Sequence, residues 1–284
     1  MSAAPAAAPA RPSRRAGRPG FASTRIGTAV LGILGIAAFA AAWEVASRAE
    51  LVPSRYLPPF STIVVDVGRV VGTRPLAGEF WEALGMTMTG WSIGLAVSIA
   101  LGVVLGVLIG SSRIVREYSA STIEFLRPIP SVGLIPVAII IFGVRPSATV
   151  FIVAWACFWI VLVHVISGVA DIDPVGDATA RSYGLGFLRR AKHLVWPTVL
   201  PYLMTGVRLS ATVALVVALT IEIVVGAPGI GKMIALYQSA GNVEVVYALA
   251  LLAGVLGLVI NLAMQALERV LLSWHPSMRD GSDA

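Results

Sequence analysis

Long apolar runs separated by short polar stretches dominate this chain. A helix needs about 20 apolar residues to cross the hydrocarbon core of a bilayer, so the pattern predicts an all-α membrane protein with six transmembrane helices. The apolar runs lie near residues 27–47, 86–110, 131–144, 148–169, 204–225 and 246–267.

The third run, SVGLIPVAIIIFG, is shorter than the others and contains Pro136. We expect this span to begin earlier, with part of the preceding STIEFLRPIP segment forming a helix before it or at the membrane interface. Pro128 and Pro130 interrupt helical hydrogen bonding, and a broken backbone is tolerated at membrane depth only where protein or water covers the freed carbonyl groups. The sequence therefore predicts a kinked or broken third span.

The composition supports a polytopic membrane protein. Of the 284 residues, 57% are hydrophobic and only 13% are charged, and the mean hydropathy is +0.86, which is too apolar for a soluble core. The net charge of +6 does not indicate a nucleic-acid partner, because the cations lie in the loops and the tail between apolar runs. The lone Cys157 can form no intramolecular disulfide. The expected surroundings are the lipid bilayer.

The distribution of cations predicts the orientation. With the N-terminus in the cytoplasm, fourteen of the 21 Lys and Arg lie on that side, six lie outside and Arg208 falls in a span. Because positive charge accumulates on the cytoplasmic side, both termini are expected there. We predict a disordered cytoplasmic tail over residues 1–25, a transmembrane domain over 26–272 and a cytoplasmic tail over 273–284.

A stripe of small residues runs along the second span at intervals of four. Such a stripe lets another backbone approach closely, either within the chain or across a homodimer interface, and ordinary internal packing is the favoured interpretation. Its members are Gly94, Ser98, Gly102, Gly106 and Gly110.

The segment GAPGIGKM, residues 226–233, matches the pattern of a phosphate-binding loop. That loop requires a preceding strand and a Ser or Thr after the Lys, whereas here a membrane span precedes it and Met233 follows Lys232. We therefore expect a turn after the fifth span and no nucleotide site. No HExxH or GxSxG motif occurs, and three His with one Cys give no convincing zinc set. The chain is therefore not expected to be an enzyme, and no cofactor or metal is expected.

Polar residues inside spans are candidates for a translocation path, because they are costly in lipid. We select Glu222, His164 and Asn261, although each also has a structural interpretation as a hydrogen-bonded residue. Arg208 is expected to snorkel or to pack between helices. A secondary transporter would place ionisable residues near mid-membrane, whereas most of these candidates lie near the ends of spans.

The polar segment DATARSYGLGFLRRAKHLVWPTVLP, residues 177–201, resembles the cytoplasmic EAA loop of ATP-binding cassette (ABC) importer permeases. Gly184, Leu194 and Pro197 fall in the register of that family. The position of the family's Glu is occupied by Ala178, and the nearest acid, Asp177, comes one residue earlier. One residue on a helix is a rotation of about 100°, so Asp177 is expected to point elsewhere than the family's Glu.

The local sequence of this loop, residues 171–201, predicts a short projecting helix that is rigidly joined to two membrane helices. Aspartates cap a short helix, Gly184 and Gly186 end it, and a basic segment then leads into the fifth span. Pro197 and Pro201 are expected to end that basic segment.

Two further stretches, FLRPIPSVGLIPVAIIIFGV and LERVLLSWHP, resemble the nitrate, sulfonate and taurine branch of the family. The similarity to that branch as a whole covers roughly residues 40–275. The resemblance implies the type I importer architecture with a cytoplasmic coupling helix, in a homodimer in the bacterial inner membrane. Two cytoplasmic ATP-binding subunits would hydrolyse the ATP, and a periplasmic or lipid-anchored solute-binding protein would deliver a small anion such as an alkylsulfonate, taurine or nitrate. The alternative is a secondary transporter independent of an ATPase. The resemblance gives this ATPase-coupling set: Asp177, Ala178, Thr179, Ala180, Gly184, Leu194 and Pro197.

Overall fold

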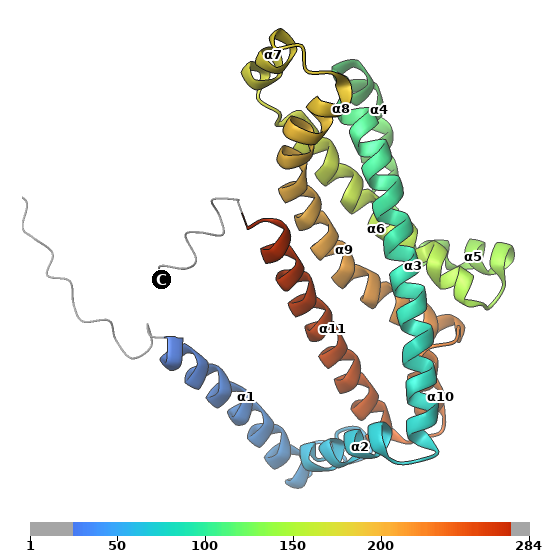
Figure 1. Ribbon diagram of the computed structural model, residues 1–284. Coiled ribbons are helices and arrows are strands. Elements are labelled where there is room, and N and C mark those ends of the chain that lie inside the picture. The colour runs from blue at the N-terminus through green and yellow to red at the C-terminus, as the bar shows by residue number, and fades with distance from the viewer. Residues whose placement is uncertain (1–24, 274–284) are drawn as a thin grey trace, which may run out of the picture. The chain divides into compact units, whose positions relative to one another are not determined.

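The computed structural model describes residues 25–273, and this part of the chain is helical without strands (Figure 1). Residues 1–24 and 274–284, which hold nearly all of the two expected tails, lie outside the described residues. The helices are α1 Arg25–Arg48, α2 Phe60–Gly72, α3 Leu76–Gly110, α4 Arg113–Leu126, α5 Ile135–Phe142, α6 Pro146–Ala170, α7 Pro174–Ser182, α8 Phe187–Arg190, α9 Trp196–Val225, α10 Ile230–Ser239 and α11 Val243–Leu271. A 3-10 turn, η2 (Ser131–Leu134), precedes α5, and a π-helical turn, η3 (Ala191–Val195), precedes α9.

Five of the described helices are long and apolar enough to cross a membrane, namely α1, α3, α6, α9 and α11. Counted as one broken span, α4 together with η2 and α5 gives the sixth, and its two parts are bent by 78° at the break between them. Pro128 and Pro130 lie in that break, and Pro136 lies in the first turn of α5, where its missing N–H costs little. The six predicted spans and the broken third span are confirmed.

The first unit of the chain, residues 1–60, contains α1 and the segment that follows it. The indole Nε1 of Trp43 donates to the carbonyl of Pro58 at 3.0 Å, and the Ser47 hydroxyl donates to the carbonyl of Leu57 at 2.7 Å. Glu44 pairs with Arg48 at 2.6 Å, one turn further along the helix. These bonds fold the segment after α1 back onto the end of that helix.

In the second unit, residues 61–284, α3 packs along α6 through the stripe of small residues. A Cβ atom added at Gly102 would lie 2.7 Å from Cγ1 of Val161, and one added at Gly106 would lie 2.7 Å from Cβ of Val165. Gly94 and Gly110 meet valines of α6 in the same way. The close approach of the two backbones therefore requires glycine, and the stripe is an internal packing seam.

Helix α6 also packs against α9. Gly206 of α9 accommodates His164, whose Cβ would lie 3.0 Å from a Cβ at that glycine. The Cys157 thiol donates to the carbonyl of Ser210 at 3.3 Å, and Trp91 of α3 donates from Nε1 to the carbonyl of Ala211 at 2.8 Å. Helices α3, α6 and α9 thus form the core of this unit, and the loop between α6 and α9 is attached to both.

Candidate functional site

The loop between α6 and α9 begins with α7, which protrudes beyond the ends of α6 and α9 (Figure 1). Asp173 caps it, because its Oδ1 accepts from the backbone N–H of Val175 at 3.0 Å and its Oδ2 accepts from that of Gly176 at 3.1 Å. Pro174 occupies the first turn of the helix, where an N–H has no acceptor in any case. The predicted short helix with an aspartate cap is confirmed.

Gly184 ends α7, and its φ of +66° places it in the left-handed region. The N–H of Leu185 donates to the carbonyl of Ala180 at 3.0 Å, and the N–H of Gly184 donates to that of Arg181 at 2.9 Å. These two bonds form a Schellman motif, which ends a helix and commonly requires glycine at the left-handed position. The chain reverses at Gly184 as predicted.

The second arm of the loop runs from α8 through η3 into α9. Pro197 lies in the first turn of α9 and Pro201 lies inside that helix, so the expectation that these prolines end the basic segment is wrong. Pro197 is tolerated there because the N–H groups of a first helical turn have no partner within the helix. The π-helical turn η3 joins the basic segment to α9 directly. Leu194 of η3 reaches α7, where its Cδ1 lies 3.5 Å from a Cβ placed at Gly176.

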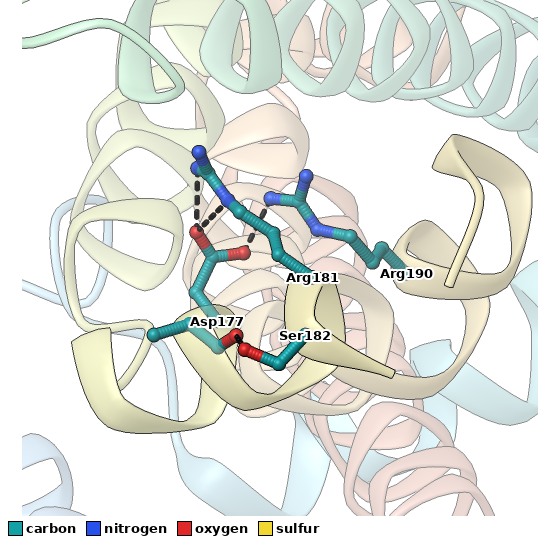
Figure 2. A network of polar contacts seen from close by, with 5 residues as sticks. Asp177, Arg181, Ser182 and Arg190 are labelled. Atoms are coloured by element: carbon teal, nitrogen blue, oxygen red, sulfur yellow. Dashed lines mark hydrogen bonds and ion pairs between the residues drawn. The ribbon is translucent and has the colours of Figure 1, made fainter. Parts of the chain in front are cut away.

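Asp177 lies in the first turn of α7, and both of its carboxylate oxygens are engaged (Figure 2). Oδ2 accepts from Nε and Nη2 of Arg181 at 3.0 and 2.7 Å, and Oδ1 accepts from Nη2 of Arg190. Desolvation favours protonation of this carboxyl, but the hydrogen bonds and charges of the two arginines outweigh it and lower the pKa of Asp177. The carboxylate points into the loop, toward the second arm.

The next three residues of α7, Ala178, Thr179 and Ala180, present small side chains. Ala178 and Thr179 are exposed and Ala180 is half-buried. The Thr179 hydroxyl donates to the carbonyl of Val175 at 2.8 Å, so it is satisfied within its own helix. The small side chains leave the helix backbone open to close approach by another protein.

Large apolar side chains are also exposed around α7, and sequence reasoning missed them. Val175 is 71% exposed, Tyr183 is 81% exposed and Leu188 is 80% exposed. An available signal was the occurrence of bulky apolar residues in a segment otherwise rich in charge. Large apolar residues exposed in an otherwise charged segment are candidates for contact with another protein.

One polar contact braces the base of the loop, and a second one joins α9 to α11. The Tyr202 hydroxyl of α9 donates to Oδ2 of Asp171, just after α6, at 2.7 Å. Arg208 of α9 pairs with Glu268 of α11 at 3.4 Å, consistent with its expected role in helix packing. The Tyr202–Asp171 bond therefore ties the end of α6 to α9 at the base of the loop.

Glu222 is fully buried at the other end of α9. Its Oε2 accepts from the Thr87 hydroxyl of α3 and from the N–H of Gly231, both at 2.9 Å, and the N–H of Ile230 donates to the same hydroxyl at 2.9 Å. The glycine-rich segment 226–233 thus holds the chain's own carboxylate and forms the turn predicted after the fifth span. A role of Glu222 in translocation stays a prediction.

The other two path candidates lie apart from Glu222. His164 Nδ1 lies 2.7 Å from the carbonyl oxygen of Ile160, and its ring packs beside Gly206, which is about 24 Å from Glu222 along α9. Asn261 is half-buried on α11. The structure does not bring these three residues together.

Comparison with known proteins identifies relatives of this chain. Residues 98–273 match the family described as binding-protein-dependent transport system inner membrane component. The putative aliphatic sulfonates transport permease protein SsuC of Escherichia coli (strain K12) is 32% identical, covering 84% of this chain and 89% of the relative. The taurine transport system permease protein TauC of the same organism is 25% identical, covering 82% and 85%. The bicarbonate transport system permease protein CmpB of Synechococcus elongatus is 25% identical, covering 86% and 89%.

The fold resembles a chain of the MetNI methionine ABC transporter in an inward-facing conformation. The TM-score is 0.55 at 20% identity, with 75% of this chain and 97% of that chain covered. This likeness confirms the expected type I importer permease architecture.

Proposed function

Because this chain belongs to the family of binding-protein-dependent transport system inner membrane components, we propose that it carries a small anion through the membrane in an ATP-driven importer. It is a multi-pass inner-membrane protein and a permease subunit of an ABC importer, a transport component rather than an enzyme. Transport proceeds by alternating access in a homodimer, with both termini in the cytoplasm.

The proposed cargo is an alkylsulfonate, taurine or nitrate. The names of the relatives refer to aliphatic sulfonates, taurine and bicarbonate, which all carry a compact anionic group. A periplasmic or lipid-anchored solute-binding protein delivers this cargo to the external side of the permease.

The observation that carries the proposal is the exposed helix α7, held rigidly between two spans of the core. Its small side chains and the apolar residues around it form a surface suited to a protein partner. The partner is a pair of cytoplasmic ATP-binding subunits, which bind and hydrolyse the ATP. Their closure moves α7, and the braced ends of α6 and α9 pass that movement into the membrane.

Family membership favours this mechanism over a secondary transporter. The coupling set of the proposal is Asp177, Ala178, Thr179, Ala180, Gly184, Leu194 and Pro197, of which Asp177 acts inside the loop. Glu222, the buried acid that a secondary transporter would need for ion coupling, is hydrogen-bonded to Thr87 and Gly231.

The test uses the assembled complex in proteoliposomes and measures the ATPase activity stimulated by cargo-loaded binding protein. Gly184→Val places a β-branched residue at a φ of +66° and deforms the end of α7. Gly186→Val is the matched control, because Gly186 has an ordinary φ and no atom within 4 Å of an added Cβ. We expect Gly184→Val to lose the stimulation and Gly186→Val to keep it. Full stimulation of the Gly184→Val complex would refute the coupling role of the loop.

A further inference from the structure

We propose that Asp177 and Arg190 form an intramolecular lock that holds the two arms of the coupling loop at a fixed angle. In this proposal Asp177 is a positioning residue and makes no contact with the ATP-binding subunits. The proposal rests on the proposed coupling function of α7 and adds to it the device that makes the loop rigid.

The lock spans the reversal of the chain at Gly184. Asp177 belongs to the first arm, α7, and Arg190 belongs to the second arm, α8, which continues through η3 into α9. In the described part of the chain, the ion pair between Asp177 and Arg190 joins α7 to the second arm. Leu194 of η3 also lies near α7, since its Cδ1 would be 3.5 Å from a Cβ added at Gly176. The bond between Asp177 and Arg190 restrains the angle between the arms.

The two charged groups depend on each other. The side chain of Asp177 is 22% exposed and that of Arg190 is 28% exposed, so little of either remains for an outside partner. Nε of Arg190 is buried and has no hydrogen-bond partner in the described part of the chain. Asp177 is thus the group that orients this guanidinium, and loss of the carboxylate would leave a largely covered cation unpaired.

Arg181 binds the same carboxylate but has a different role. It lies on α7 itself, four residues after Asp177, and its side chain is 67% exposed. A pair of this kind within one helix cannot restrain the second arm, and exposed pairs contribute little to stability. Figure 2 shows both guanidinium groups at the one carboxylate. The chain therefore supplies a matched pair of arginines, one that crosses the turn and one that does not.

The lock explains the offset of the acid in this sequence. At Asp177 the carboxylate faces the second arm, while the following residues Ala178 and Thr179 are exposed for a partner. A carboxylate one residue later would be rotated by about 100° around α7 and would leave Arg190 without its acceptor.

The experiment compares Arg190→Gln with Arg181→Gln in the complete complex of permease, ATP-binding subunits and cargo-loaded binding protein. We expect Arg190→Gln to lower the ratio of stimulated to basal ATPase activity about fivefold, the lower end of the range typical of coupled sites. Arg181→Gln should leave that ratio close to wild type. Both complexes should retain their ATP-binding subunits on purification, because the lock does not form the docking surface.

A distance measurement reports the lock directly. Spin labels at Thr179→Cys and Lys192→Cys, both exposed in the structure, lie on the two arms of the loop. The native Cys157 is buried and does not take up label. The distribution of distances between the labels should broaden with Arg190→Gln and with Asp177→Asn and should stay narrow with Arg181→Gln. The double variant Asp177→Asn with Arg190→Gln should be no worse than either single variant, because the two residues act as a unit.

Three results would overturn the lock. They are an unchanged ATPase ratio and distance distribution in Arg190→Gln, equal effects of Arg190→Gln and Arg181→Gln, and a loss of ATP-binding subunits from the Asp177→Asn complex. The Gly184→Val result separates this failure from a failure of the proposed function. If Gly184→Val abolishes the stimulation of ATPase activity while Arg190→Gln leaves it unchanged, only the lock is refuted. If both variants leave the stimulation unchanged, the coupling role of the loop is refuted as well.

Discussion

The seam between α3 and α6 leads to a prediction about Gly102→Ala. The added methyl group would lie 2.7 Å from Cγ1 and 2.9 Å from Cβ of Val161, and 3.2 Å from the backbone nitrogen of Leu162. Val161 is fully buried, so its β-branched side chain cannot turn away. The helices must separate to restore an ordinary contact distance.

Overpacking of a tight contact typically costs about 1–3 kcal/mol. For a chain of this size that corresponds to a drop in melting temperature of roughly 2–10 °C. A change from Gly to Ala also raises helix propensity, and the control must share this gain. Gly85→Ala lies on the same helix, and no atom lies within 4 Å of its added Cβ.

The assay is thermal unfolding of the detergent-purified chain, followed by circular dichroism. Gly102→Ala should melt below Gly85→Ala by the stated amount. Combining Gly102→Ala with Val161→Ala should recover only the part of the loss due to the Cγ1 contact, because Cβ of residue 161 remains 2.9 Å from the added methyl group. Equal melting temperatures for Gly102→Ala and Gly85→Ala would refute the account of the seam.

Two further predictions concern buried and charged carboxylates. Glu222→Ala leaves the Thr87 hydroxyl and the Gly231 N–H without their buried acceptor and should lower the free energy of unfolding by about 1–3 kcal/mol. Glu222→Gln retains an acceptor oxygen and should lose less in the same denaturation assay, so equal losses would contradict the hydrogen-bond account. The lowered pKa of Asp177 means that the lock is fully formed above the ordinary carboxyl pKa of about 4 and is lost only as the pH falls through the lowered value. The distribution of spin-label distances across the loop should therefore stay constant from about pH 8 to pH 5. If the distribution broadened as the pH fell through that window, and if this dependence on pH were absent from Asp177→Asn, the assignment would be contradicted.

Much of the architecture follows from local sequence. Five of the six apolar runs are long enough to indicate spans, and the prolines at 128 and 130 predicted the bend in the third. The spacing of small residues by four predicted the α3 seam, because that spacing keeps them on one face of a helix. The aspartates of the loop and Gly184 predicted that α7 is a short capped helix that ends at that glycine, because a cap and a left-handed glycine act within a few residues of themselves.

The site itself depends on contacts that local sequence does not encode. Asp177 meets Arg190 only after the chain has reversed at Gly184, and Glu222 meets Thr87, 135 residues away, only after α3 and α9 have packed. The expectation for Pro197 and Pro201 was wrong because Pro197 lies in the first turn of α9, where its missing N–H costs little, and α9 continues through Pro201. The exposure of Tyr183 follows from the protrusion of α7, which depends on how α6 and α9 are held in the core.

The most direct test of the central claim is cross-linking from α7 in the assembled complex. Ala178→Cys places an exposed thiol on α7, and Ser239→Cys places an exposed thiol on α10, after α9 has crossed the membrane. We predict that Ala178→Cys forms cross-links to the ATP-binding subunit and is protected from a membrane-impermeant maleimide added outside the cell, whereas Ser239→Cys is labelled from outside and forms no such cross-link. Labelling of Ala178→Cys from outside, without a cross-link to the ATP-binding subunit, would contradict the account.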